Sequence, residues 1–137
     1  MPPPVAGLYE YLAEFREHDP VQYAQECRLV DYMRGLRAAG EVGTRALDVA
    51  GGLWSRIKAR WAGVRLPVPD MAPCGDGGIM MAFDNGRHHL EFEVLRSGEI
   101  EVFYRCRDTN LCREWEYVSE DDLRWDFAAE LALFAAS

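Results

Sequence analysis

The residues of this chain that are best suited to chemistry are its histidines and cysteines. His88 and His89 are adjacent and follow an Asp-Asn-Gly segment at 84–86. The chain also has four cysteines, which are Cys27, Cys74, Cys106 and Cys112. Imidazole nitrogens and thiolates are common zinc ligands, and a histidine beside a cysteine can activate the thiol as a nucleophile. A metal site and a Cys–His pair are therefore the two kinds of chemistry to test against the spacing.

The spacing of these residues argues against a metal site. Adjacent residues on a strand point to opposite faces of the sheet, so His88 and His89 do not chelate one ion together. A zinc ion needs three or four converging ligands, and the cysteines form no C-x-x-C pair. We therefore expect no metal and no cofactor. A dyad of Cys74 with one of the two histidines stays open as the basis of a small Cys/His-dependent enzyme.

Cys106 and Cys112 flank the segment RDTNL. A three-residue loop at 108–110 would place them directly opposite each other across a hairpin, where the geometry can allow a disulfide. In a reducing compartment both are expected to stay free and to pack as small residues. Neither has a sequence cue for a lowered thiol pKa, so we expect no catalytic nucleophile here.

The glycine-rich segment CGDGG at 74–78 lacks the features of a phosphate-binding loop. It has no Lys-Ser/Thr pair, and it precedes a strand, whereas phosphate loops lead into a helix N-terminus. We interpret the segment as the scaffolding of a turn.

Glutamates alternate with apolar residues in the second half of the chain. Six of them are expected on the outer, charged face of a sheet: Glu91, Glu93, Glu99, Glu101, Glu114 and Glu116. Like charges on neighbouring strands repel, and Arg105, Arg107 and Arg113 are available to lie between them. General acid–base catalysis needs two carboxylates in different environments, and no feature distinguishes one here. The pattern favours a charged face that meets solvent or a basic partner.

Helical periodicity dominates the part of the chain that would precede this sheet, residues 1–62. Apolar residues recur at helical spacing over 5–18. A second helix is predicted from Asp19, an N-cap residue followed by proline, to Gly40, which supplies a stop. A third helix is predicted over about 44–61.

Residues 63–78 contain three prolines and four glycines and are predicted to form an extended linker. Over 79–118 the apolar period changes to two, with turn signals between the runs. This alternation predicts a four-stranded antiparallel meander with one apolar face and one charged face.

Residues 119–137 are predicted to form a last helix that covers the apolar face. Ser119 is a suitable N-cap. Its apolar stripe consists of Leu123, Phe127, Leu131 and Phe134. Trp125 lies off this stripe, so we expect it to be partly exposed and to serve as an interface anchor. The predicted fold is therefore α+β in a single domain, 1–137, with about three helices, then the meander, then the C-terminal helix.

Bulk composition narrows the classes of function. A chain of 137 residues with 49% hydrophobic residues suits one domain with a buried core. The formal net charge is −8, and residues 66–137 carry 6 Lys and Arg against 15 Asp and Glu. This charge argues against direct nucleic-acid binding. No apolar run is long enough to span a membrane, and the first residues show no basic leader, so we expect a cytoplasmic protein.

Several segments of the second half resemble a broad group of small, uncharacterised bacterial proteins. The segments are LPVP at 66–69, DGGIMMAF at 76–83, HLEFEV at 89–94, RSGEI at 96–100 and REWEY at 113–117. The chain departs from the group where MAF replaces Leu-Glu-Trp and where GEVGT lies near a missing Trp- and Gly-containing segment. The resemblance implies a small accessory protein, linked for some members to toxin–antitoxin or defence operons. It transfers no catalytic residue.

Three hypotheses on function follow from these observations. The leading one is a non-enzymatic protein-binding module, similar to an antitoxin, an immunity protein or an inhibitor. It would use the six glutamates and Trp125 against a protein with a basic surface. The second is an assembly subunit that forms a homodimer or pairs its nearly neutral helical half with its acidic half. The third is the Cys/His-dependent enzyme.

Overall fold

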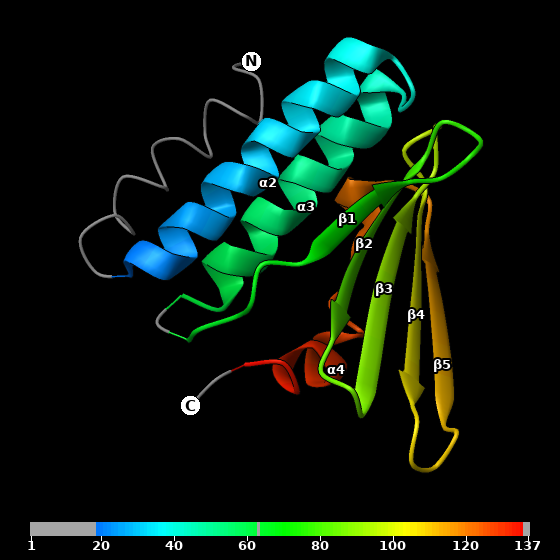
Figure 1. The fold of residues 1–137 in the computed structure, drawn as a ribbon. Coiled ribbons are helices and arrows are strands. Elements are labelled where there is room, and N and C mark those ends of the chain that lie inside the picture. Colours follow the sequence, from blue (N-terminus) through cyan, green and yellow to red (C-terminus); the bar gives the residue numbers. More distant parts are fainter. Residues whose placement is uncertain (1–18, 63, 136–137) are drawn as a thin grey trace.

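The structure is a computed structural model that describes residues 19–62 and 64–135. It confirms an α+β fold with an antiparallel sheet (Figure 1). The elements, in chain order, are α2 Pro20–Ala39, α3 Thr44–Arg60, β1 Asp70–Pro73, β2 Ile79–Asp84, β3 His88–Val94, β4 Ile100–Cys106, β5 Cys112–Tyr117, the 3-10 turn η1 Glu120–Asp122 and α4 Ala128–Ala132. The helix predicted over 5–18 lies outside the described residues. None of the described helices combines the length and the apolar character needed to cross a membrane.

The ends of α2 follow from local signals in the sequence. The Asp19 carboxylate accepts a hydrogen bond from the Gln22 amide at 3.0 Å, and Pro20 occupies the first helical position. At the other end Gly40 takes a left-handed φ of 73° and its amide donates to the Leu36 carbonyl. These caps confirm the predicted bounds of this helix.

The sheet has five strands in the order β1-β2-β3-β4-β5, and each pairs antiparallel with the next. The predicted four-stranded meander corresponds to β2–β5. The prediction that all of 63–78 is a linker was wrong, because Met71 pairs with Met81 and Pro73 with Ile79 to form β1. Proline removes a ladder donor but is tolerated in an edge strand. The formation of β1 therefore depends on its pairing with β2, and its sequence shows no alternation of apolar and polar residues.

The C-terminal helix predicted over 119–137 was wrong in extent. Ser119 makes no side-chain capping bond, η1 is a single 3-10 turn, and α4 is only 5 residues long. The Tyr117 hydroxyl lies 3.2 Å from the Arg124 carbonyl oxygen and 3.0 Å from the Asp126 carboxylate, and these contacts accompany a non-helical path. The apolar residues still reach the sheet, since Phe127 and Leu131 are fully buried.

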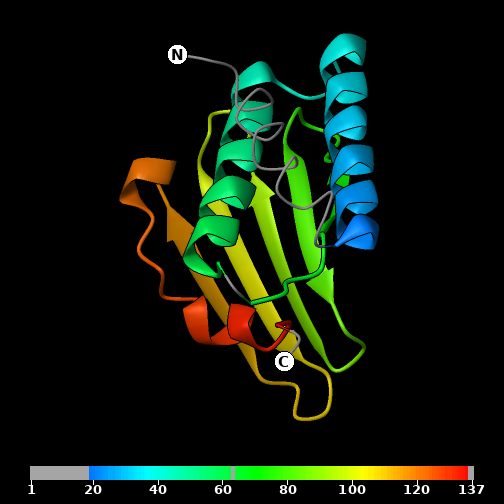
Figure 2. The ribbon, with the colours of Figure 1, turned by 90° about the vertical axis from the view of Figure 1, so that its left-hand side faces the viewer.

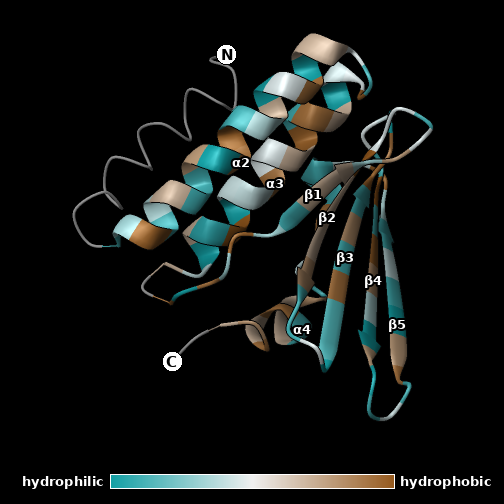
Figure 3. Ribbon diagram, viewed as in Figure 1, coloured by the Kyte–Doolittle hydropathy of each residue, from teal (hydrophilic) through white to brown (hydrophobic). Residues whose placement is uncertain are grey.

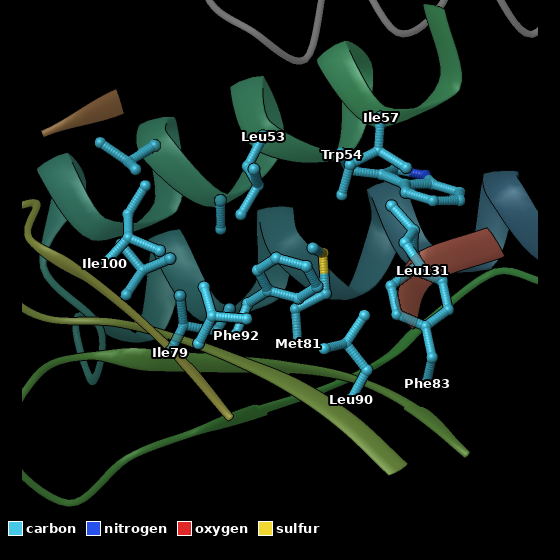
Figure 4. Packing of buried hydrophobic residues seen from close by; sticks show 14 of the residues in the cluster. Leu53, Trp54, Ile57, Ile79, Met81, Phe83, Leu90, Phe92, Ile100 and Leu131 are labelled. Atoms are coloured by element: carbon cyan, nitrogen blue, oxygen red, sulfur yellow. The ribbon is translucent and has the colours of Figure 1, made fainter. Parts of the chain in front are cut away.

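All described α-helices lie on one side of the sheet (Figure 2). We call the side of the sheet that faces them the inner face and the opposite side the outer face. Met81, Leu90 and Phe92 point from the inner face toward Leu53 and Trp54 of α3 (Figure 4). All five of these side chains are fully buried, so the apolar half of each predicted alternation forms the core.

Candidate functional site

No described element covers the outer face of the sheet (Figure 1), and hydrophilic residues alternate with hydrophobic ones along β3, β4 and β5 (Figure 3). Strand alternation places the side chains of β3, β4 and β5 by turns on the inner and the outer face. The outer-face positions at the centre of these strands are Glu91, Glu93, Glu101, Phe103, Glu114 and Glu116. Five of the six predicted glutamates therefore lie together on this face.

The register arranges three of these glutamates in one row. Glu93 of β3 pairs with Glu101 of β4, and Glu101 pairs with Glu116 of β5. In the next row Phe103 lies between Glu91 and Glu114. Residues directly opposite each other across strands have Cβ atoms about 5 Å apart, so the glutamate row brings three like charges side by side.

The electrostatics of the row reflect this crowding. Burial, together with the charges of Glu93 and Glu116, raises the pKa of Glu101 above its ordinary value. Of the six glutamates, only Glu91 has a basic side chain within ion-pair distance in the described part of the chain. That partner is His89, whose Nε2 lies 3.3 Å from Glu91 Oε1.

The acidic rows surround two shallow, adjoining hollows. One, of about 120 Å³, is lined by Phe103 and the glutamates of both rows. The other, of about 280 Å³, shares Glu101 and Glu116 and adds Glu99. Glu99 lies in the turn between β3 and β4, so the sixth glutamate joins the site from the turn rather than from a strand.

The three arginines that were available to lie between the glutamates do not do so. Arg105 lies on the outer face but one row further along, where its Nη2 donates to Asn110 Oδ1 at 3.3 Å. Arg107 pairs with Asp84. Arg113 lies opposite Tyr104, which places it on the inner face, and it pairs with Glu130 at 3.1 Å. Strand alternation sends Arg113 to the other side of the sheet, and the other two arginines pair outside the glutamate rows.

A third row of the outer face holds paired charges. Both Asp84 oxygens accept hydrogen bonds from Arg107, and His89 Nδ1 lies 2.9 Å from Asp84 Oδ2. The hydrogen bonds from Arg107 and from the Gly86 amide hold the pKa of Asp84 well below its ordinary value. The outer face thus combines a neutralised end with an unneutralised acidic centre.

The two histidines lie on opposite faces, in agreement with the prediction. His89 is on the outer face, whereas His88 lies on the inner side, with its Nδ1 2.7 Å from the Tyr104 hydroxyl. Within residues 19–62 and 64–135 no three His, Cys, Asp or Glu side chains are arranged to hold a metal ion.

Cys106 and Cys112 are not opposite each other, contrary to the prediction. Cys112 pairs with Arg105, and the Cys106 amide donates to the Leu111 carbonyl at 2.9 Å, so four residues form the loop. Cys106 is therefore buried on the inner face while Cys112 is exposed on the outer face. Hydrogen bonds from Thr109 lower the pKa of the Cys106 thiol to about 7, which the sequence did not indicate. The loop that follows β4 brings Thr109 close to the thiol.

The candidate dyad of Cys74 with a histidine is not assembled. Cys74 follows the end of β1 that pairs with Ile79, whereas the two histidines lie at the other end of β2, where His89 pairs with Asp84, roughly 17 Å of strand away. Burial and the neighbouring Glu93 carboxylate raise the pKa of the Cys74 thiol. A raised pKa disfavours the nucleophilic thiolate.

Trp125 is half-buried on the helical side of the sheet rather than among the glutamates. Its ring centroid lies 5.9 Å from that of Trp61 and 5.5 Å from that of Phe127, and the Arg60 guanidinium lies 4.9 Å from its centroid. The ring that lies among the glutamates is Phe103, which sequence reasoning did not single out. Its signal was present, because it occupies a polar position in the alternation of β4.

The chain was also compared with known proteins. Models of protein families, curated proteins and solved structures give no match to it. The geometry of the outer face is therefore the basis for the functional argument.

Proposed function

We propose that this protein is a non-enzymatic protein-binding module, similar to an antitoxin, an immunity protein or an inhibitor, whose outer sheet face binds a basic protein surface. The observation that carries this proposal is the row Glu93–Glu101–Glu116, which has no arginine or lysine within ion-pair distance in the described residues. Like charges directly opposite each other across strands are destabilising. A soluble surface does not need such a row, since interspersed charges of both signs serve solubility better.

The chemistry of the site suits arginine and lysine side chains in particular. Carboxylates accept two parallel hydrogen bonds from one guanidinium, which is the geometry of strong, specific ion pairs. The 120 Å³ hollow sets Phe103 among these carboxylates, and an aromatic ring attracts a cation placed over its face. Arrangements that lower stability occur most often at functional sites, and the row of three adjacent like charges is such an arrangement.

The same charge disfavours two other partners for this face. Phosphates of a nucleic acid would add negative charge to an acidic surface. A second copy bound face to face would bring two glutamate rows together. A basic protein is the partner that removes the repulsion.

The test is capture of partners by the tagged protein from its native host, at low and at high salt. The outer-face variant Glu101→Gln/Glu116→Gln is compared with the matched control Asp31→Asn/Glu41→Gln, which removes two exposed carboxylates on the helical side. We expect one stoichiometric basic protein, retained by the wild type and the control, released by salt, and bound at least about tenfold more weakly by the outer-face variant.

Two results would contradict the proposal. One is equal retention of the partner by the outer-face variant and the control. The other is recovery of the protein alone at low salt, which would shift weight to self-assembly and call for its mass in solution.

A further inference from the structure

Strand β5 forms an open edge of the sheet, with only β4 beside it among the described strands (Figure 1). The Cys106 amide bonds the Leu111 carbonyl, and bonded pairs alternate along an antiparallel ladder. Arg113, Trp115 and Tyr117 therefore bond to β4. The amides and carbonyls of Glu114 and Glu116 consequently face the open edge.

The opposite edge of the sheet is protected in a way that β5 is not. β1 is 4 residues long and ends in Pro73, and Pro67 and Pro69 precede it. Short length and proline are common means of blocking the addition of another strand. β5 is 6 residues long and contains no proline or lysine. An edge with unpaired backbone groups that is neither very short nor interrupted by proline is a template for strand addition.

We infer that the partner binds by adding an extended, basic segment antiparallel to β5, an inference that rests on the proposed function of the outer face. The two glutamates of β5 whose side chains are on the acidic face, Glu114 and Glu116, are also those whose backbone groups face outward. One incoming strand would therefore satisfy the free backbone groups and neutralise the carboxylates at once. Antiparallel addition continues the pairing of every strand in this sheet.

The geometry also specifies the side chains of the incoming strand. Residues opposite Glu114 and Glu116 would have their side chains on the outer face, where lysine or arginine meets the carboxylates. The residue between them would lie opposite Trp115, on the inner face. Trp115 is half-buried with its ring 6.3 Å from that of Phe127, so an apolar residue suits this position. The expected motif is basic–apolar–basic.

A second copy of this chain is a poor occupant of the same edge. Two β5 strands paired about a two-fold axis would place Glu114 and Glu116 beside their counterparts, and like charges opposite each other are destabilising. Charge complementarity thus favours a different, basic chain.

The test uses the full protein and a short synthetic peptide in which arginine alternates with valine. Two matched peptides carry backbone N-methyl groups, one set at the arginines and one set at the valines. Arginines that face the glutamates would direct their amides to β5, whereas the valine amides would point away. We expect methylation at the arginines to weaken binding about tenfold or more and methylation at the valines to have little effect.

Amide hydrogen exchange in the protein provides an independent readout. On binding, the Glu114 and Glu116 amides should be protected about tenfold, whereas those of Arg113 and Trp115, already bonded to β4, should change little. A peptide with glutamate in place of arginine should not bind.

Three outcomes would overturn the inference. Salt-sensitive binding that is equal for both methylated peptides would show that the acidic face binds basic peptides without strand addition. The proposed function would then hold without this inference. Failure of every peptide to bind would rule out strand addition. The proposed function would still be tested separately by partner capture with Glu101→Gln/Glu116→Gln. A dimer in solution that Glu114→Pro, but not Glu114→Gln, converts to a monomer would assign the edge to a second copy.

Discussion

The same strands form both faces of the sheet, but the two faces bury their aromatic side chains to different extents. On the inner face, Phe92 of β3 is fully buried and its ring packs edge-on against Phe127 at 5.0 Å. On the outer face, Phe103 of the neighbouring strand is half-buried between glutamates. Burial of a large aromatic side chain is a main source of stability, whereas a half-exposed one contributes much less. The inner face therefore maintains the fold, whereas the outer face, which no described element covers, contributes little to stability.

The two faces also differ in whether their carboxylates have a cation beside them. The buried Glu26 carboxylate accepts hydrogen bonds from Lys58 at 3.2 Å and from Trp54 at 3.0 Å, and the buried Glu130 pairs with Arg113. Glu101, on the outer face, has only like charges as its close cross-strand neighbours. Each of these two buried carboxylates thus has a cation beside it, whereas Glu101 has none in the described residues.

The strongest test of the comparison exchanges phenylalanine for alanine on each face. Phe92→Ala should lower the free energy of unfolding by about 4 kcal/mol, because it leaves a cavity in the core. Phe103→Ala should lower it by about 1 kcal/mol or less. Urea unfolding followed by fluorescence measures both. If Phe92→Ala does not fold, Phe92→Leu should still show a loss of about 1.5 kcal/mol. Equal losses at the two positions would contradict the assignment of the faces.

A second test concerns the buried ion pair. Lys58→Met should lower the free energy of unfolding by about 3 kcal/mol, because it leaves the Glu26 carboxylate without its cation in a buried site. The double variant Glu26→Gln/Lys58→Met should lose less than Lys58→Met alone, since no charge is then left uncompensated. A double variant as unstable as the single one would argue against this account of the pair.

The paired row of the outer face predicts a dependence on pH. The folded-state pKa of Asp84 is below its unfolded value of 3.8, so its ionisation stabilises the fold above that value, and the contribution is lost as the pH falls toward the folded pKa. Asp84→Asn should lower the free energy of unfolding at pH 7 by about 1 kcal/mol, partly screened because the side chain is partly exposed. Urea unfolding from pH 7 to pH 2 should show the two proteins converging in acid. A constant difference would count against the ion pair.

The unpaired row should give the smallest effect, and one of opposite sign. The folded-state pKa of Glu101 is raised above its ordinary 4.5, so its ionisation costs stability at neutral pH, and the cost disappears as the pH falls below that value. Glu101→Gln/Glu116→Gln should therefore raise the free energy of unfolding at pH 7 by about 0.5 kcal/mol. The gain should shrink in high salt and in acid, whereas Asp31→Asn/Glu41→Gln should show none. A loss of stability would show that the row is not strained.

Much of the fold was predictable because its signals are local. The Asp19-Pro20 start and the Gly40 end of α2 depend on residues within one turn of the helix. The alternation in β2–β5 depends only on the pleat of each strand. β1 was missed, and α4 was overestimated, because each depends on contacts with segments distant in the sequence. For β1 these are the pairs with β2, and for α4 the preceding bonds of Tyr117 with Arg124 and Asp126.

The same distinction between local signals and long-range contacts applies to the candidate site. By itself, the sequence determined which side chains share a face, because alternation within a strand is a property of the backbone. Glu91 and Glu93 on one face and Leu90 and Phe92 on the other follow from it. The sequence also determined the sign of the charge on the outer face.

Only the tertiary structure decided which of those side chains become neighbours. The pairing of β3, β4 and β5 sets Glu93, Glu101 and Glu116 in one row. The length of one loop separates Cys106 from Cys112, and the described helices all lie over one face of the sheet. The physical reason is that a shift of one residue in register preserves every local preference while it exchanges every cross-strand neighbour. Long-range packing of the inner face therefore selects the register that creates the acidic row.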